Sequence, residues 1–310
     1  MNPGAHRCSL WSVGVATLWL CAGAGAMRAV ASEPPPKALL AEADQVRTSD
    51  HSRFVQILQQ LHREQGRLTL PQRWHLKLLD ATRHSLAGNY AEAVPGLQEI
   101  IKHCPDRSLV VRATAQMIQA KFVSRHYQQA YDLANTLTSN LPEITDPVAR
   151  LAVLDQLVQM MNSVGQYDLA LKYARLMKAS FPSGKGRCEG NLAETQTLFY
   201  SGKLTSDSPR FQHSIDTCLA VHAVVMANTM RLDQANALID EGHPQQAITL
   251  LQKMAPGILT ASYQFHVAAL HIAFADAYTQ LGEDTEARRS ALAALAANGD
   301  NKVNWVVQYA

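Results

Sequence analysis

The chain has 310 residues, of which 47% are hydrophobic and 17% are charged, with 28 basic and 26 acidic side chains. Residues 1–32 contain two basic residues and no acidic residue. The rest of the chain therefore has equal numbers of basic and acidic residues and no formal net charge. Without a basic surplus to neutralise phosphates, we expect no nucleic-acid partner. The apolar content suffices for a long helical core, built mostly of Ala and Leu.

Residues 1–31 have the features of a signal peptide. Arg7 gives a basic start, Leu10–Ala22 is an apolar core, and an Ala-Val-Ala motif at 29–31 precedes Ser32. We therefore predict export, cleavage near Ser32 and a periplasmic location. If residues 1–31 were not cleaved, they would instead anchor the chain in the membrane. We expect membrane association only in that case.

Residues 32–69 are predicted to form a linker and a pair of capping helices. Pro34–Pro36 is an extended lead-in, and Lys37–Arg47 is a first helix. Asp50 is placed to cap a second helix that runs through His62. The pair lacks the turn and proline pattern that follows, which is typical of the end of a repeat array.

From residue 70 to residue 299 the chain repeats one pattern. It consists of a turn residue, a Tyr two positions later, an Ala three after that, an apolar residue four further on, and a Pro twelve after the Ala. Three copies are Gly88/Tyr90/Ala93/Leu97/Pro105, Arg125/Tyr127/Ala130/Ala134/Pro142 and Gly165/Tyr167/Ala170/Ala174/Pro182. Two weaker copies are Gly242/Ala247/Leu251 and Gly282/Ala287/Ala291, with Pro256 and Gly299 near the closing position. The double-length interval between Gly165 and Gly242 predicts one degenerate unit there.

Each unit is predicted to be a helical hairpin. Apolar residues recur with helical spacing on both sides of the turn, and Pro follows the second helix because it cannot continue one. No strand-like alternation is present, so the class is all-α. The pattern resembles the tetratricopeptide repeat family, with a small residue at the helix crossing, a Gly-x-Tyr turn and a terminal Pro. The resemblance implies a right-handed α-solenoid, after which residues 300–310 begin an element that these residues do not finish.

The degenerate unit lies between Gly186 and His222. Asn191 and Glu194 have the spacing of a capping box before a helix to Tyr200, and Ser208 with Pro209 begins a second helix. In an antiparallel hairpin the start of one helix faces the end of the other. We therefore predict a disulfide between Cys188 and Cys218 in the oxidising periplasm, with Cys104 left free. Two free buried thiols are the alternative.

Motifs of known catalytic and metal sites are missing. The sequence has no G-x-S-x-G, H-E-x-x-H, C-x-x-C or Walker A motif, and its histidines lack the spacing of metal ligands. We therefore expect no enzyme activity in these 310 residues, no cofactor and no metal.

The functional surface that the resemblance implies is the concave groove lined by the first helix of each hairpin. The polar residues that this geometry assigns to the groove are Gln116, Gln119, Asp155, Gln159, Asn162, Asp233, Asn236 and Asp276. An amide- and carboxylate-lined groove suits a peptide, a protein or a polar small molecule as partner. The alternative is that these side chains form an ordinary solvated face.

The chain also resembles the periplasmic repeat region of bacterial membrane-bound diguanylate cyclases. The segments that carry the resemblance are TSDHSRFVQILQQL, TLPQRWHL, GNYAEA and FQHSIDTCLAVHAVVMANTMRLDQANALIDEGHPQQAITLLQ. In that family a transmembrane helix and a GGDEF cyclase domain follow the repeats, and no GGDEF motif occurs here. The resemblance therefore implies the sensory input part of such a signalling protein, lacking its output domain. A periplasmic scaffold for other proteins is the alternative.

Overall fold

The computed structural model describes residues 34–261 and 263–298, which contain fourteen α-helices, two 3-10 helices and no strand. The predicted signal peptide and the C-terminal tail lie outside these residues. The α-helices are α1 Pro36–Val46, α2 His51–Arg63, α3 Leu70–Leu86, α4 Tyr90–His103, α5 Arg107–Val123, α6 Tyr127–Asn140, α7 Pro147–Ser163, α8 Tyr167–Ser180, α9 Gly184–Tyr200, α10 Pro209–Leu219, α11 Val224–Asp240, α12 Pro244–Ala261, α13 Gln264–Gln280 and α14 Asp284–Asn298. The 3-10 helices are η1 Gln65–Arg67 and η2 Leu141–Glu143.

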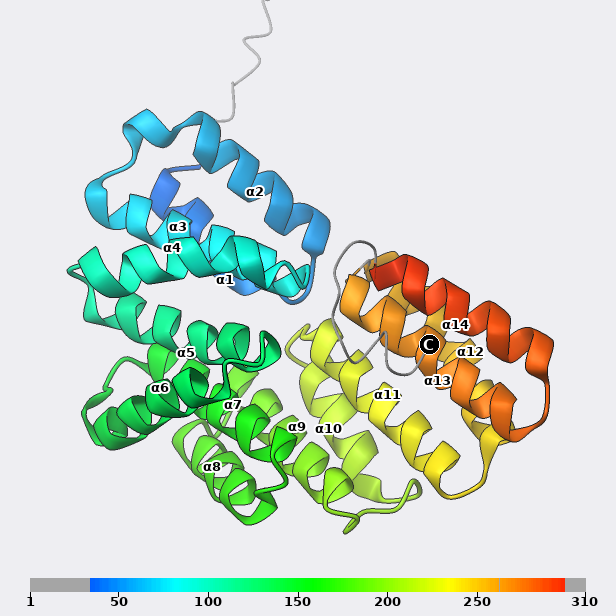
Figure 1. Ribbon diagram of the computed structural model, residues 1–310. Helices are drawn as coiled ribbons and strands as arrows, with labels where there is room; N and C mark the ends of the chain where they lie inside the picture. Colours follow the sequence, from blue (N-terminus) through cyan, green and yellow to red (C-terminus); the bar gives the residue numbers. More distant parts are fainter. Residues whose placement is uncertain (1–33, 262, 299–310) are drawn as a thin grey trace, which may run out of the picture. The chain divides into compact units, whose positions relative to one another are not determined.

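The helices form successive hairpins in two layers (Figure 1). Each odd-numbered helix packs against the odd-numbered helix of the next hairpin, from α1 through α13. Consecutive even-numbered helices do not make contacts of comparable extent among the described residues. Because one layer is closely packed and the other spread, the stack curves with the odd-numbered helices on its inner side. This is the all-α solenoid that the repeats predict.

The two helices of six hairpins are joined by turns with the same backbone conformation. The residues with positive φ at these turns are Gly88, Arg125, Gly165, Gly202, Gly242 and Gly282. A left-handed residue ends a helix because its backbone turns away from the helical path, and Gly adopts this conformation without a Cβ penalty. Gly202 lies 37 residues after Gly165 and 40 before Gly242. It is therefore the turn of the predicted degenerate unit.

The starts of several inner helices are fixed by local capping. The Thr69 hydroxyl accepts a hydrogen bond from the Gln72 amide, and the Gln72 side chain accepts one from the Thr69 amide, so the two form a capping box before α3. Asp106 caps α5, and Asp146 caps α7 by accepting from the Ala149 amide at 2.7 Å. These caps satisfy amides that have no partner inside the helix.

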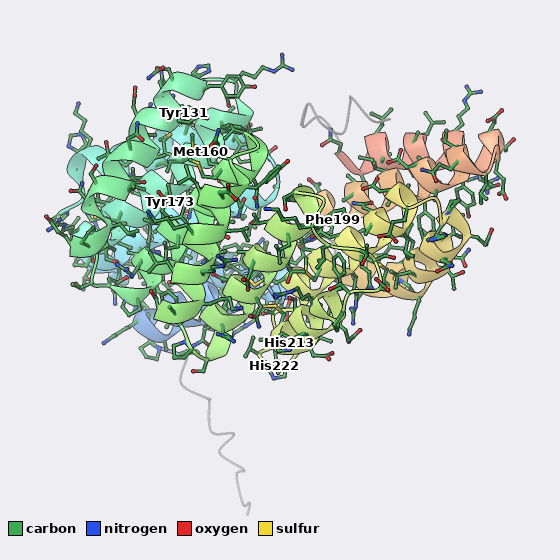
Figure 2. All side chains as sticks on the ribbon, turned by 90° about the horizontal axis from the view of Figure 1, so that it is seen from below. Tyr131, Met160, Tyr173, Phe199, His213 and His222 are labelled. Atoms are coloured by element: carbon green, nitrogen blue, oxygen red, sulfur yellow. A yellow bond between two sulfur atoms is a disulfide. The ribbon has the colours of Figure 1, made fainter. Side chains whose placement is uncertain are left out.

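The core between hairpins is built from small and long apolar residues in alternation. Ala130 and Ala170, the repeat alanines of α6 and α8, are fully buried. Met160 of α7 is buried in the same part of the molecule, with Tyr131 and Tyr173 packed against this core (Figure 2). Small residues allow the helix pair to approach closely, and the long ones fill the space on either side.

The predicted capping box at Asn191 and Glu194 is wrong, because α9 begins two turns earlier, at Gly184. Both residues are buried inside the helix. Asn191 Nδ2 donates to Thr217 Oγ1 at 3.2 Å, and Glu194 forms an ion pair with Lys178. Three glycines made this stretch unlike a helix in sequence, but packing overrides that weak propensity. A Cβ on Gly186 would lie 2.6 Å from Phe181, so the glycine is needed for close approach.

The degenerate unit contains a disulfide between Cys188 and Cys218. Their sulfurs are 2.07 Å apart and their Cα atoms 4.7 Å apart. Cys188 lies in the second turn of α9 and Cys218 in the last turn of α10, so the start of one helix faces the end of the other. Cys104 is a free, half-buried thiol.

Pro256, which the repeat pattern places near the closing position of its unit, does not end its helix. The α12 helix contains Pro256 and continues to Ala261. Proline removes one backbone hydrogen bond and does not by itself end a helix when the surrounding contacts hold it. The buried side chains of Met254 and Ile258, on either side of the proline, provide such contacts.

Candidate functional site

A set of charged side chains lies on the inner helices α1, α3, α5, α7 and α9. The carboxylate of Asp44 on α1 is its best-satisfied member. It accepts hydrogen bonds from His75 Nε2 on α3 at 2.7 Å and from Arg112 Nη2 on α5. Burial alone would raise the pKa of Asp44, but the bond from His75 and the charge of Arg112 hold it well below its usual range. The Asp44 carboxylate is therefore ionised, and its hydrogen bonds link three consecutive inner helices, α1, α3 and α5.

Further along the inner layer, four charged groups gather without pairing closely. Arg47, just after α1, approaches the Asp44 carboxylate only at 4.0 Å. Lys185 on α9 donates to the neutral hydroxyl of Thr48 at 2.8 Å. Among the described residues, Asp155 on α7 accepts from just two amides, both of its own helix: Gln159 at 2.7 Å and Gln156 at 3.3 Å. Within the described ranges, Glu189 on α9 has no hydrogen bond or ion pair. We call Arg47, Asp155, Lys185 and Glu189 the mixed-charge cluster.

The electrostatics of this cluster reflect its lack of close pairs. Burial, together with the charge of Asp155, raises the pKa of Glu189 to about 7. Burial also raises the pKa of Asp155 and, with the charge of Arg47, lowers the pKa of Lys185. Burial penalises each charged form, and the opposite charges nearby compensate only in part. Perturbed groups of this kind mark candidate functional sites.

A second polar region occupies the inner faces of α9, α11 and α13. Asp233 on α11 is buried and accepts from Gln196 Nε2 on α9 at 2.8 Å. Burial raises the pKa of Asp233 to about 7, although the hydrogen bond with Gln196 opposes the shift. The buried His266 on α13 is within 2.8 Å of Thr229 Oγ1, and burial lowers its pKa to about 4. Asp233 and His266 therefore each link two inner helices, and burial sets the pKa of each.

The structure places all eight sequence-predicted groove residues on odd-numbered helices. Those of α5 and α7 are Gln116, Gln119, Asp155, Gln159 and Asn162, and those of α11 and α13 are Asp233, Asn236 and Asp276. Asp155 and Gln159 are bonded to each other. Gln116 instead donates to Thr82 on α3 at 2.8 Å. Asp233 is buried between helices, so it is a packing residue of the inner layer rather than an exposed groove residue.

Two of these residues have a buried oxygen without a hydrogen-bond partner among the described residues, Gln116 Oε1 and Asn162 Oδ1. The orientation of the Gln116 amide follows from its neighbour. Thr82 donates its hydroxyl proton to the Leu78 carbonyl at 2.8 Å, so its oxygen accepts from Gln116 and the amide nitrogen must face it. An unpaired buried acceptor costs free energy, which a donor from a ligand would offset.

Sequence reasoning missed several residues of the charged face, namely Asp44, Arg47, His75, Arg112, Lys185 and Glu189. His75 and Arg112 were detectable, since each lies thirteen residues before the turn residue of its repeat, at Gly88 and Arg125. Lys185 and Glu189 were hidden by the late start assigned to α9. Arg47 belongs to a hairpin that lacks the repeat pattern.

The turn between α1 and α2 reaches across to helices far along the chain. Besides the Thr48–Lys185 bond, the Tyr263 hydroxyl before α13 donates to the Arg47 carbonyl at 2.9 Å. The rings of His51 and Tyr263 meet edge to face at 5.3 Å between centroids. A hollow of about 600 Å³ lies beside this turn, lined by Ser49, Asp50, His51, Ser52, Val224, Pro256, Gly257 and Thr260. Residues 47–51 therefore border the inner face and contact both α9 and the segment before α13.

Within residues 34–261 and 263–298, no group of three or more His, Cys, Asp or Glu side chains is arranged to hold a metal ion. No helix in this part of the chain combines the length and apolar character needed to span a bilayer.

Comparison with known proteins adds information on the fold. No family model matches the chain, and no curated protein matches it. A similar solved structure is that of a Rap protein complexed with competence and sporulation factor. It has a TM-score of 0.63 and 12% sequence identity, and the match covers 89% of this chain and 80% of that one. This chain therefore has a tetratricopeptide-like helical-repeat fold.

Proposed function

We propose that this protein is a binding module that takes up a peptide, a protein segment or a polar small molecule on the inner face of its odd-numbered helices. The observation that carries the proposal is the mixed-charge cluster. Asp155 and Glu189 are half-buried there, and neither has an ion-pair partner within the described residues. Burying a charge is unfavourable unless it is paired. A ligand that supplied the missing partners would offset this cost.

The fold provides a second, weaker argument. The Rap protein of similar fold was crystallised with competence and sporulation factor. Helical-repeat stacks expose an extended curved surface, which suits them to binding long or irregular partners. Fold likeness alone does not establish function, so the proposal rests on the charged face and not on the comparison.

We further propose that the module is periplasmic and forms the sensory input of a signalling protein of the diguanylate cyclase type. This is supported by the signal-peptide features of residues 1–31 and by the sequence resemblance described above. The DNA downstream of codon 310 tests it. A reading frame that continues into an apolar segment of about 20 residues and a GGDEF motif would support the sensor, whereas intergenic sequence would favour a scaffold.

Photo-crosslinking tests whether the inner face binds a partner. A photoreactive phenylalanine is placed at Gln159, which is exposed on α7, and at Lys172, which is exposed on the outer helix α8. We expect adducts in the native host from position 159 and none from position 172. Equal adducts from both positions, or adducts from position 172 alone, would contradict binding on the inner face. Folded proteins among the position-159 adducts would favour the scaffold over the sensor.

A further inference from the structure

We infer that the mixed-charge cluster is a binding site for a compact zwitterion, a molecule that carries an ammonium group and a carboxylate close together. A free α-amino acid and a short peptide with unblocked ends both have this chemistry. The inference rests on the proposed binding function and specifies its ligand. It follows from where the four charges of the cluster lie and from what each of them contacts.

The cluster is assembled by three separate elements. Lys185 and Glu189 lie four residues apart on α9, so they share one helix face. Asp155 comes from α7, which packs against α9 in the inner layer. Arg47 comes from the turn after α1, which the Thr48–Lys185 bond holds beside the start of α9. No single helix or local motif contains this set, so only the fold brings the four charges together.

The cluster retains unused hydrogen-bonding capacity of both signs. An ammonium group has three donors, and Lys185 uses one of them on the Thr48 hydroxyl. Arg47 donates its Nε to the Asp44 carbonyl at 3.3 Å, which leaves most of its five donors. On the acidic side, Asp155 accepts only from neutral amides, and Glu189 accepts from no described residue. Two cationic donor groups, Lys185 and Arg47, and two carboxylate acceptors, Asp155 and Glu189, are therefore available to a bound molecule.

The balance of charges selects the ligand class. A ligand with only positive charge would be attracted by Asp155 and Glu189 but repelled by Lys185 and Arg47. A purely anionic ligand would meet the reverse situation. A zwitterion pairs its ammonium with the two carboxylates and its carboxylate with the two cations, so each charge gains a partner. The nearby Asp44 is already bonded to His75 and Arg112, and it therefore does not compete.

Proton release gives the site a measurable signature. Glu189 has a pKa of about 7 in the free protein because burial and Asp155 disfavour its anion. An ammonium group bound beside it would stabilise the anion and lower this pKa. Binding near neutral pH should therefore release protons, and the apparent enthalpy should vary with the ionisation enthalpy of the buffer.

The test uses the purified full chain and three defined probe pools. The first contains the twenty free amino acids, the second contains tripeptides with free ends, and the third contains the same tripeptides with acetylated and amidated ends. Compounds retained by the protein on ultrafiltration are identified by mass spectrometry and titrated by calorimetry. We expect retention from the first or second pool and none from the third. Which pool is retained distinguishes a free amino acid from a peptide.

Variants show whether the retained compound occupies the cluster. Lys185→Met and Glu189→Gln should each weaken its binding about tenfold or more, as expected for loss of a charge-assisted hydrogen bond. Lys172→Met and Glu92→Gln are matched controls, exposed on α8 and α4, and should leave binding unchanged. Glu189→Gln should also abolish proton release, which a purely structural role would not do. Melting temperatures of all four variants monitor folding.

Three outcomes would overturn the inference: retention of the blocked pool as strongly as the free pool, retention of none of the pools, or unchanged affinity in both cluster variants. The crosslinking experiment at position 159 is independent of these probes. Specific adducts there without retained zwitterions would reject the zwitterion site and leave the proposed binding function intact. If neither adducts at position 159 nor retained zwitterions were found, both the zwitterion site and the proposed binding function would be rejected.

Discussion

The Lys185 ammonium on α9 donates to the Thr48 hydroxyl at 2.8 Å, although 137 residues separate the two along the chain. The same turn receives a hydrogen bond from Tyr263, which lies 216 residues after Arg47. These contacts hold residues 47–51 in place beside the mixed-charge cluster. The position of this turn is therefore coupled to α9 and to the segment before α13.

We predict that Lys185→Met increases the mobility of this turn. The substitution keeps most of the aliphatic length but removes the donor to Thr48. Hydrogen–deuterium exchange of peptides covering residues 47–52 should become faster, with little change in α3 and α4. Lys172→Met, on the outer face of α8, is the control and should leave exchange in residues 47–52 unaltered. Unchanged exchange in the Lys185 variant would show that the contact does not restrain the turn.

Gly186→Ala should destabilise the protein even though Ala is the better helix former. A Cβ at this position would lie 2.6 Å from the Phe181 side chain, so α8 and α9 must separate or Phe181 must move. Overpacking of this kind costs about 1–3 kcal/mol. Gly96→Ala on α4 is the matched control, since its nearest neighbours would be 3.9 Å away. There we expect a stabilisation of up to about 1 kcal/mol. Urea unfolding of both variants measures the difference.

Replacing the repeat alanine Ala170 by Phe should cost about 1–3 kcal/mol, because the site is fully buried at a helix crossing. Ala130→Leu on α6 tests the equivalent position of the preceding repeat. Ala179→Phe, at an exposed position of α8, is the control and should be nearly neutral. Thermal melts provide the measurement. An unchanged midpoint for Ala170→Phe would contradict the repeat register.

Loss of the Cys188–Cys218 disulfide should lower stability substantially. The bond spans a separation of 30 residues, and cross-linking a loop of that length contributes roughly 3–4 kcal/mol in the chain-entropy model. Denaturant unfolding of the double variant Cys188→Ala/Cys218→Ala measures the loss. If residues 1–31 are removed as predicted, thiol titration of the denatured, unreduced protein should find one free thiol, that of Cys104. Three free thiols would show that the bond does not form.

The contribution of Asp233 to stability should fall as the pH rises from about 4 to about 7. Its pKa is raised to about 7 by burial in the folded protein, whereas in the unfolded chain an aspartate titrates near 3.9. Between these values the folded state binds more protons than the unfolded state, so a rise in pH favours unfolding. The variant Asp233→Asn should be more stable than the native protein at pH 8, and the difference should shrink towards pH 4. A difference that is independent of pH would exclude ionisation of Asp233 as its cause.

The repeat pattern predicted the architecture because each of its positions has a local effect on the backbone or on helix packing. A left-handed residue at each hairpin turn, Ala93, Ala130 and Ala170 at the crossings, and Pro after the second helix each follow from the chemistry of one or two residues. The proximity of Cys188 and Cys218 also follows from hairpin geometry alone. These features could be predicted, since they depend on spacing within a single unit.

The tertiary structure alone decided the start of α9 and the charged inner face. Gly184, Gly186 and Gly190 disfavour a helix in isolation. Only the tertiary structure makes Gly186 and Gly190 suitable, because they lie close to Phe181 and Lys178 at the end of α8. Lys185 meets Thr48 because the curvature of the inner layer accumulates over several hairpins, which no spacing within one repeat encodes. The shifted pKa values of Glu189 and Asp233 arise from burial in the folded inner layer. The charge of a side chain can be read from the sequence, whereas its desolvation depends on the whole fold.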